Sequence, residues 1–234
     1  MFKNAQPLDK VQHAHLRFTP APDMSSSREM TTVPLTLSEI AASALCFPVL
    51  FTPDGEVRPM AVLGLIDGNT FLDEHNQWTA PYVPAHILRH PFILGKLQEE
   101  GNFLVMIDVD APQFTKEDGE PLFTEAGEPS AHTQANIRFL EEFEKNMQQD
   151  QVILAELEQS GVLTSNNITI KDGEATRLIG GFRVVDQEKV NALDDATLGR
   201  WTRSGLLALI HAHWLSMNHL NKVAVVSSRR KQAD

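Results

Sequence analysis

The stretch FPVLFTPDGEVRPMAVLGLI, residues 47–66, decides the fold, because two apolar runs flank the dipeptide Asp54-Gly55. Both runs are rich in Val, Leu, Ile and Phe, and such residues suit a pleated, half-buried strand. Asp-Gly between two such runs is a strong local signal for a β-hairpin, since the turn needs backbone with positive φ. The stretch therefore predicts two antiparallel strands joined by a tight turn.

Elements on both sides of this hairpin can be predicted from hydrophobic periodicity and capping residues. Thr36 begins a helix signature, and Thr70–Leu72 is expected to continue the sheet as a third strand. Further predicted elements are a strand at 102–108, a helix at 133–157, a hairpin at 167–185 with a bulge at Gly180-Gly181, and helices at 194–204 and 206–223. Strands grouped early and helices grouped late predict an α+β fold. We expect a mostly antiparallel sheet built from hairpins, with helices packed on it and a helical C-terminal third.

The domain organisation follows from composition. Residues 1–32 are polar and predict an extended leader over the surface, and residues 227–234 predict a basic, solvated tail. No low-complexity linker interrupts the chain between them. The sequence therefore predicts a single α+β domain over 33–226.

The net charge of −11 is concentrated in one part of the chain. Residues 99–158 hold fifteen acidic and three basic residues, and the remainder is nearly neutral. A general nucleic-acid-binding protein carries a basic stripe, and this sequence has none. A nucleic-acid partner is therefore not expected.

The beginning of the sequence, MFKNAQPLDK, lacks the apolar region of a secretory signal peptide, and no apolar run reaches the length of a membrane span. The single cysteine, Cys46, excludes an internal disulfide. These features predict a soluble, cytoplasmic protein with no transmembrane segment. Surface association would require an export route without a classical signal.

Catalytic fingerprints are missing from the sequence. It contains no G-x-S-x-G, Walker or dinucleotide-binding pattern, so no cofactor is predicted, and the balance favours a non-enzymatic protein. Ser216, with His213 one turn earlier, is a weak candidate for a nucleophile and its base. The alternative interpretation is that His213 is a polar position beside the core stripe of its helix.

The segment WTAPYVPAHILRHPF, residues 78–92, gathers rare residue types in a short space. Aromatic and arginine side chains are the usual anchors of binding interfaces, and they make Trp78, Tyr82, Arg89 and Phe92 candidate binding residues. In the alternative interpretation, Trp78 and Tyr82 pack the sheet and Arg89 pairs with a buried carboxylate.

Histidines in the same segment raise the question of a metal site. His86 and His90 are four residues apart and would share one face of a helix, as two metal ligands can. Pro84 and Pro91, however, limit that helix to two turns. No His-Glu-x-x-His motif and no cysteine pair supports zinc.

Two further carboxylate patterns could hold a metal ion. Asp73-x-His75 could supply two ligands of a facial triad, but its surroundings predict a turn rather than a strand. Asp108-Val-Asp110 begins an acidic stretch, but Pro112 and Gln113 break the calcium-loop pattern. A solvated acidic loop over 110–130 is expected instead.

Segments along the whole chain resemble the SapC family of bacterial proteins. The similar segments, in order, are Phe2-Lys-Asn-Ala-Gln-Pro-Leu, His13-Ala-His-Leu, Pro34-Leu-Thr-Leu-Ser-Glu, Phe47-Pro-Val-Leu-Phe, Ala61-Val-Leu-Gly-Leu, Trp78-Thr-Ala-Pro-Tyr-Val-Pro-Ala, Arg89-His-Pro-Phe, Ile107-Asp108, Pro121-Leu-Phe, Gly127-Glu-Pro, Gly180-Gly-Phe and Ser216-x-Asn218. The resemblance covers nearly the whole chain. One departure is His75-Asn76, where relatives often have Asp-Gly before the Trp, so His75 is not a shared ligand.

The resemblance implies a non-enzymatic accessory or binding protein associated with a bacterial surface layer, a secretion system or an outer-membrane uptake system. A protein or peptide partner is expected. The alternative is a metal-dependent enzyme, or the partner subunit of an oxygenase, that uses some of His75, His86, His90 and Asp108. The family has no catalytic residues that could be transferred to this sequence.

Overall fold

The computed structural model describes residues 2–20, 23–65, 68–96, 103–172 and 175–230. Its contacts group into two compact units. Unit 1 consists of Met1–Arg28, Leu72–Thr79 and Ala85–Lys145, and unit 2 consists of Glu29–Phe71, Ala80–Pro84 and Asn146–Asp234. The single α+β domain over 33–226 stays a prediction.

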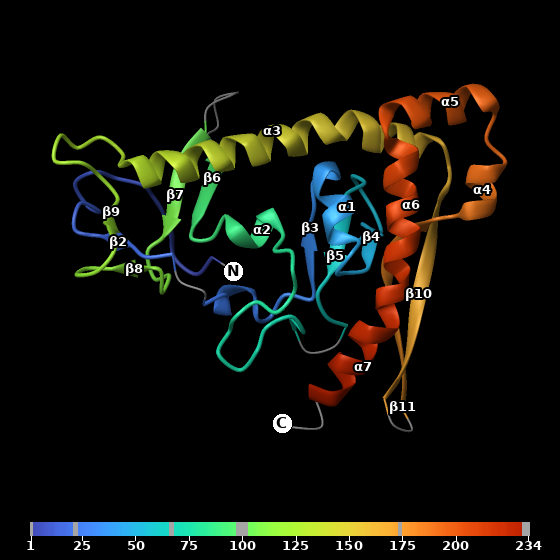
Figure 1. Cartoon of the computed structure of the whole chain (residues 1–234), viewed down its shortest axis with the longest axis horizontal. Coiled ribbons are helices and arrows are strands. Elements are labelled where there is room, and N and C mark those ends of the chain that lie inside the picture. Colours follow the sequence, from blue (N-terminus) through green and yellow to red (C-terminus); the bar gives the residue numbers. More distant parts are fainter. Residues whose placement is uncertain (1, 21–22, 66–67, 97–102, 173–174, 231–234) are drawn as a thin grey trace. The chain divides into compact units, whose positions relative to one another are not determined.

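Unit 1 contains two three-stranded sheets, with strand orders β1-β7-β6 and β8-β2-β9 (Figure 1). Its elements are β1 (Ala5–Pro7), β2 (Arg17–Phe18), a 3-10 helix (Ser25–Ser27), α2 (Ala85–Leu88), β6 (Phe92–Lys96), β7 (Phe103–Asp108), β8 (Phe114–Thr115), β9 (Glu120–Pro121) and the first part of α3 (Ala131–Gln159). The apolar strand predicted at 102–108 is confirmed as β7, although Asn102 lies outside the described residues.

The core of unit 1 lies between its strands and the start of α3. Its buried members are Leu16, Phe18, Phe92, Ile107, Leu122 and Leu140. The rings of Phe18 and Phe92 are 5.7 Å apart in a tilted arrangement that aromatic pairs favour. This core joins the beginning of the chain to residues more than a hundred positions later.

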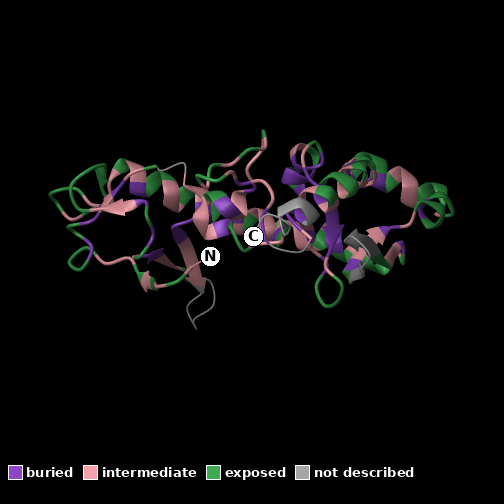
Figure 2. Ribbon diagram, turned by 90° about the horizontal axis from the view of Figure 1, so that it is seen from below, coloured by how far each residue is buried: buried purple, intermediate pink, exposed green. Residues whose placement is uncertain are grey.

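The leader and the acidic loop are more structured than the sequence suggests. β1 pairs with β7, and the two-residue strand β2 pairs with β8 and β9, which both lie in the predicted loop 110–130. Residues 116–121 remain exposed, as expected for a solvated acidic segment (Figure 2). Backbone pairing therefore connects segments that have little apolar periodicity of their own.

Unit 2 is built on a five-stranded sheet of order β10-β11-β4-β5-β3. Its elements are β3 (Thr32–Pro34), a 3-10 helix (Leu37–Glu39), α1 (Ile40–Ser43), β4 (Val49–Phe51), β5 (Pro59–Val62), the second part of α3, β10 (Leu163–Asp172), β11 (Ala175–Val185), α4 (Gln187–Asn191), α5 (Asp195–Ser204), α6 (Leu206–Ser216), a 3-10 helix (Met217–His219) and α7 (Leu220–Arg230). One buried cluster of this unit joins Leu50, Val62, Phe182 and Val223.

The hairpin predicted around Asp54-Gly55 is confirmed, because β4 and β5 pair antiparallel and Gly55 has φ +70°. The third strand predicted at Thr70–Leu72 is wrong. Thr70 N–H donates to the Leu63 carbonyl oxygen, and Phe71 N–H donates to Asn69 Oδ1. These local bonds use N–H groups that a strand ladder would need, and Leu72 forms an isolated bridge with Trp78 instead of a described strand.

The second predicted hairpin is confirmed as β10 and β11, and its turn residues 173–174 lie outside the described residues. The pairing register shifts between Asn166 and Ile168, opposite Gly180-Gly181. Gly181 has φ +84°, which an L side chain rarely adopts. The predicted bulge is therefore present.

The predicted helices are present, with small differences at their ends. The helix expected at 133–157 is α3, the helix expected to end at Gly205 is α5, and the helix predicted at 206–223 is divided into α6 and α7. On α6 the buried positions are Leu206, Ile210, His213 and Ser216. His213 therefore lies in the core rather than beside it.

Side chains of α6 bond to the backbone of β4 and β11. Among the described residues, these two strands pair through one residue pair, Arg183 and Phe51. His213 Nδ1–H donates to the Val49 carbonyl oxygen at 2.7 Å, and His213 Nε2 accepts the Val185 N–H at 3.1 Å. Ser216 Oγ accepts the Val49 N–H at 2.9 Å. Buried backbone groups need such partners, so the helix replaces missing ladder bonds.

The strand pairs among the described residues are all antiparallel, and α6 packs against β4 and β11. The α+β prediction, with a mostly antiparallel sheet and a helical C-terminal third, is confirmed. The predicted tail begins inside α7, and residues 231–234 lie outside the described residues. In the part of the chain that is described, no helix is both long and apolar enough to cross a membrane.

Candidate functional site beside His90

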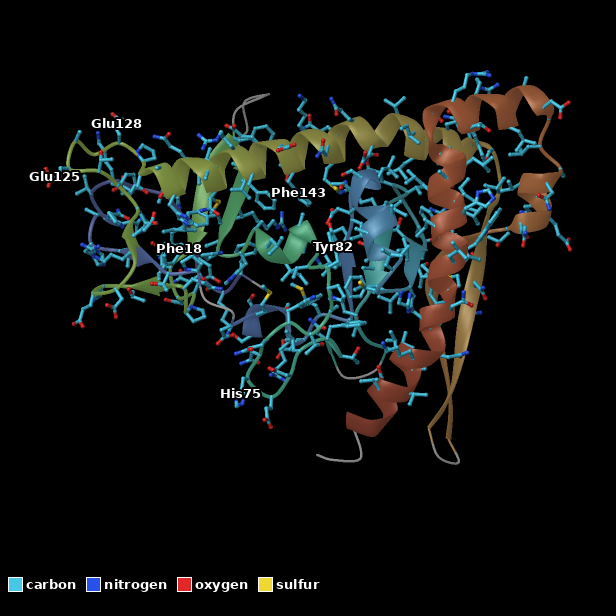
Figure 3. All side chains as sticks on the ribbon, in the orientation of Figure 1. Phe18, His75, Tyr82, Glu125, Glu128 and Phe143 are labelled. Carbon is cyan, nitrogen blue, oxygen red and sulfur yellow. The ribbon has the colours of Figure 1, made fainter. Side chains whose placement is uncertain are left out.

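The segment 78–92 is divided between the two compact units. Trp78 is half-buried in unit 1, whereas Tyr82 belongs to unit 2. The hydroxyl of Tyr82, which Figure 3 labels, donates to Glu39 Oε1 at 2.9 Å. Phe92 is 1% exposed and lies in the core of unit 1. These three predicted binding residues therefore have three different environments.

His90 and Asp108 form a buried pair at the centre of unit 1. His90 Nε2 is 3.4 Å from Asp108 Oδ2, and both side chains are 3% exposed. Asp108 also accepts the N–H groups of Lys3 at 2.9 Å and Asn4 at 3.0 Å. The Asp108 carboxylate thus bonds both to the backbone at the beginning of the chain and to a ring nitrogen of His90.

Burial lowers the pKa of His90, while the hydrogen bond and charge of Asp108 oppose that shift. Burial alone would raise the pKa of Asp108, but the N–H groups of Lys3 and Asn4, together with His90, lower it. The pair is therefore a neutral imidazole beside a carboxylate at neutral pH. An imidazole in this state donates from the nitrogen that faces the carboxylate and accepts at the other.

A pocket of about 160 Å³ lies against His90. Its lining residues come from the leader, from α2 and from the acidic loop, and they are Phe18, Pro20, Asp23, Met24, Ser26, Ile87, Leu88, His90 and Gln113. Two buried polar atoms of these residues, His90 Nδ1 and Gln113 Oε1, have no hydrogen-bond partner among the described residues. Such atoms are uncommon in folded proteins and indicate a missing partner.

A larger pocket of about 260 Å³ lies in unit 2, next to Gly180-Gly181. Its walls are mainly apolar, and its described polar side chains are those of Thr31 and Thr32. None of the buried polar atoms without a partner in the described chain belongs to its lining. The pocket beside His90 is therefore the better candidate for selective binding, because polar groups fix the orientation of a ligand.

Arg89 is held within unit 1 by aromatic side chains. Its guanidinium carbon lies 5.7 Å from the centre of the Phe2 ring and 5.5 Å from that of Phe143, which Figure 3 labels. Burial lowers the pKa of Arg89, and the charge of Glu144 opposes this shift. The Arg89 guanidinium therefore makes cation–π contacts, and its pairing with a buried carboxylate stays a prediction.

The two histidines of the metal hypothesis have different partners. His86 Nε2 is 3.4 Å from an Arg89 nitrogen, and burial together with the Arg89 charge lowers the pKa of His86 to about 3. His90 instead contacts Asp108. Over the described ranges, no group of three or more His, Cys, Asp or Glu side chains is arranged to hold a metal ion.

The remaining carboxylate patterns have structural roles. Asp73 Oδ1 accepts the N–H groups of His75 and Gln77, which closes a turn and leaves the His75 side chain exposed (Figure 3). Asp110 accepts the side-chain N–H of Asn4 at 3.1 Å. The turn expected at residues 74–77 is present, so Asp73 and His75 do not act as two ligands of one strand.

Ser216 and His213 do not form a nucleophile and base. Ser216 Oγ–H donates to the His213 carbonyl oxygen at 2.6 Å, and both ring nitrogens of His213 bond to strand backbone. The weak catalytic hypothesis is therefore wrong. Asp23, Ser26 and Gln113, which line the pocket, carry no periodicity or motif that could have identified them.

A model of the SapC family matches residues 8–223. The chain belongs to the SapC family. Neither the curated proteins nor the solved structures give a significant match. Every residue that lines the pocket beside His90 lies within the SapC match, whereas Lys3 and Asn4 lie before it.

Proposed function

We propose that this SapC-family chain is a non-enzymatic accessory protein that binds a protein or peptide partner. The partner is a component of a bacterial surface layer, a secretion system or an outer-membrane uptake system. A side chain of the partner enters the pocket beside His90. The role of partner contacts outside the pocket stays with Trp78 and Arg89 of unit 1 and with Tyr82 of unit 2, all of them half-buried, while Phe92 is assigned to the core.

One observation carries the proposal: the residues that line the pocket combine apolar side chains with two buried polar atoms that lack partners among the described residues. Leaving such atoms unpaired costs free energy, so a ligand that pairs them gains affinity and selectivity. The pocket of about 160 Å³ is close in size to an engineered cavity that holds benzene, and it suits one side chain.

The test is affinity capture from the bacterium that encodes the chain, after mild cross-linking and with the full chain tagged. Ser26→Phe fills the pocket, since Ser26 lines it from the 3-10 helix Ser25–Ser27. Ser25→Phe is the matched control in the same turn, because Ser25 does not line this pocket.

We expect the wild-type chain and Ser25→Phe to capture the same surface-layer, secretion or outer-membrane component, and Ser26→Phe to lose it. Circular dichroism checks that both variants are folded. Capture of that component by folded Ser26→Phe at the wild-type level would show that the pocket is not the binding site. We propose that the chain resides in the cytoplasm before it meets its partner, and cell fractionation tests that location.

A further inference from the structure

Two of the residues that line the pocket beside His90 carry buried hydrogen-bond acceptors. His90 Nε2 faces Asp108 Oδ2 at 3.4 Å, and a carboxylate can only accept, so the imidazole proton lies on Nε2. Nδ1 of the neutral ring is then an acceptor, and it has no partner among the described residues. Which ring nitrogen carries the proton is fixed by the bond that the other makes.

Gln113 supplies a second acceptor. Its Nε2 donates to the Asp23 carbonyl oxygen at 3.4 Å, and the reversed amide would bring two oxygens together there. In this orientation of the Gln113 amide, Oε1 is buried and has no hydrogen-bond partner among the described residues. Gln113 is 7% exposed, so bulk water does not readily satisfy this oxygen.

The charge of the lining is negative. Asp23 lines the pocket, and no Lys or Arg is found among the described lining residues. Lys3 lines instead a neighbouring pocket of about 90 Å³, which contains Asp108 and shares Ser26 and His90 with this one. An anion in the pocket beside His90 would thus meet a carboxylate and two acceptors, with no Lys or Arg among the described lining residues to compensate its charge.

The apolar lining residues of the pocket indicate which kind of stem the ligand has. Phe18, Pro20, Met24, Ile87 and Leu88 supply apolar surface around the polar groups. An ammonium group has three N–H donors and no acceptor, and its aliphatic stem packs well on apolar surface.

We propose that the pocket beside His90 binds a primary ammonium group on a short aliphatic stem, with His90 Nδ1, Gln113 Oε1 and the Asp23 carboxylate as its acceptors. This inference rests on the proposed function and specifies the partner's side chain as a lysine. A free alkylamine carries the same ammonium group, and the peptide probes described below distinguish it from a lysine side chain of the partner.

The experiment is a titration of the full chain followed by NMR of the ¹⁵N-labelled His90 ring. The probes are n-butylammonium, n-butylguanidinium, 1-butanol and butyrate at constant ionic strength. We expect n-butylammonium to shift the His90 Nδ1 signal saturably and to bind at least tenfold more tightly than the other three probes. Equal or tighter binding of butyrate, 1-butanol or n-butylguanidinium, or no shift with n-butylammonium, overturns the proposal.

Variants test the named acceptors. Gln113→Met keeps the length of the side chain but removes the oxygen, and it should weaken n-butylammonium binding at least tenfold. Asp23→Asn keeps the acceptor that Ser25 N–H uses at 2.7 Å but removes the charge, and it should weaken binding several-fold. Asp110→Asn, an exposed carboxylate outside this pocket, should leave the affinity unchanged. Unchanged affinity in both pocket variants also overturns the proposal.

Two peptide probes separate the sources of the ammonium group. N-acetyl-lysine methylamide should bind at least as tightly as n-butylammonium, and the same compound acetylated on Nζ should not shift His90. Binding of n-butylammonium without the lysine probe rejects the lysine assignment. Failure of every ammonium probe, while Ser26→Phe still loses the captured partner, rejects the ligand class but leaves the proposed function standing.

Discussion

His213 shows how one buried side chain makes the stability of unit 2 depend on pH. Burial lowers its pKa from the usual 6.5 to about 4, although the hydrogen bond to Val49 opposes the shift. Between these two pH values the unfolded chain binds more protons than the folded chain. We therefore expect the free energy of unfolding to be highest above pH 6.5 and to fall by about 3 kcal/mol as the pH falls to 4.

Urea unfolding of wild type and His213→Gln between pH 4 and 7.5 measures this dependence. The variant should be less stable at pH 7.5 by about 1–3 kcal/mol, because a buried backbone group loses its partner, and should show a flatter pH profile. His211→Gln is the matched control, since His211 is exposed on the same helix. A profile that stays equally steep in His213→Gln would assign the pH dependence to another group.

Asp150 affects the free energy of unfolding in the opposite direction to His213, because its contribution falls as the pH rises. Burial raises its pKa and the charge of Glu39 adds to this, while the Leu37 N–H, which donates to Asp150 Oδ2 at 2.6 Å, opposes it. A raised pKa means that the stability contributed by protonation is present at low pH and is lost as the pH rises. Asp150→Asn keeps the acceptor and removes the charge.

We expect Asp150→Asn to increase the free energy of unfolding at pH 7 by up to about 1 kcal/mol, and the gain to vanish at acidic pH where Asp150 is protonated. Chemical unfolding at pH 7 and pH 3.5 measures both values. Glu142→Gln, an exposed acid on the same helix, is the control for general charge removal. A loss of stability at pH 7 in Asp150→Asn alone would contradict this account.

Residue types in the segment 78–92 singled out His90, which lines the proposed pocket, but the residues around it could not be predicted. The partner of His90 is Asp108, eighteen positions away, and the pocket needs Asp23 and Gln113 from two irregular segments. Such side chains meet only because distant strands pair. Periodicity describes which face of a helix or strand is apolar, and it does not encode long-range polar pairs.

The end of α5 gives a prediction about a helix rather than a site. Gly205 ends the helix with φ +80°, a left-handed conformation that strains any residue with a Cβ, whereas Gly199 lies inside the helix. Gly205→Ala should lower the free energy of unfolding by about 1 kcal/mol. Gly199→Ala should raise it by about 0.5–1 kcal/mol, because its Cβ meets only the Arg203 side chain at 3.5 Å. Thermal unfolding of both variants measures the two changes, and a shift in the same direction for both would contradict the assignment.

Elements with strong local signals were predictable, and elements that depend on distant partners were not. The Asp54-Gly55 hairpin and α3 follow from turn residues and 3.6-residue periodicity. The strands β8 and β9 have two residues each and exist only by pairing with β2, about a hundred positions away. Their local sequence contains no alternation that could identify them.

The two compact units are both discontinuous in sequence. The chain passes between them at residues 28/29, 71/72, 79/80, 84/85 and 145/146, the last of these within α3. Because neither unit is a continuous segment, neither can be excised as one piece. We therefore expect the whole chain to unfold in one cooperative transition, with a ratio of calorimetric to van't Hoff enthalpy of about 1.

Fluorotryptophan labelling tests this expectation by ¹⁹F NMR in increasing urea. Trp78 reports on unit 1, and Trp201 and Trp214 report on unit 2. The three signals should lose their folded intensity with one midpoint. Two separated midpoints would show that the units unfold independently, and would replace the prediction of a single domain over 33–226.

The junction between β4 and β11 has a consequence for amide hydrogen exchange. The N–H groups of Val49 and Val185 are bonded to Ser216 and His213 of α6 rather than to a neighbouring strand. Their exchange with solvent deuterium therefore requires α6 to lift away, while the strands stay in place. Amide exchange at Val49 and Val185 should thus be as slow as that of the α6 amides, and His213→Gln should accelerate all of them together. The exchange rates of these two strand amides therefore report how often α6 opens.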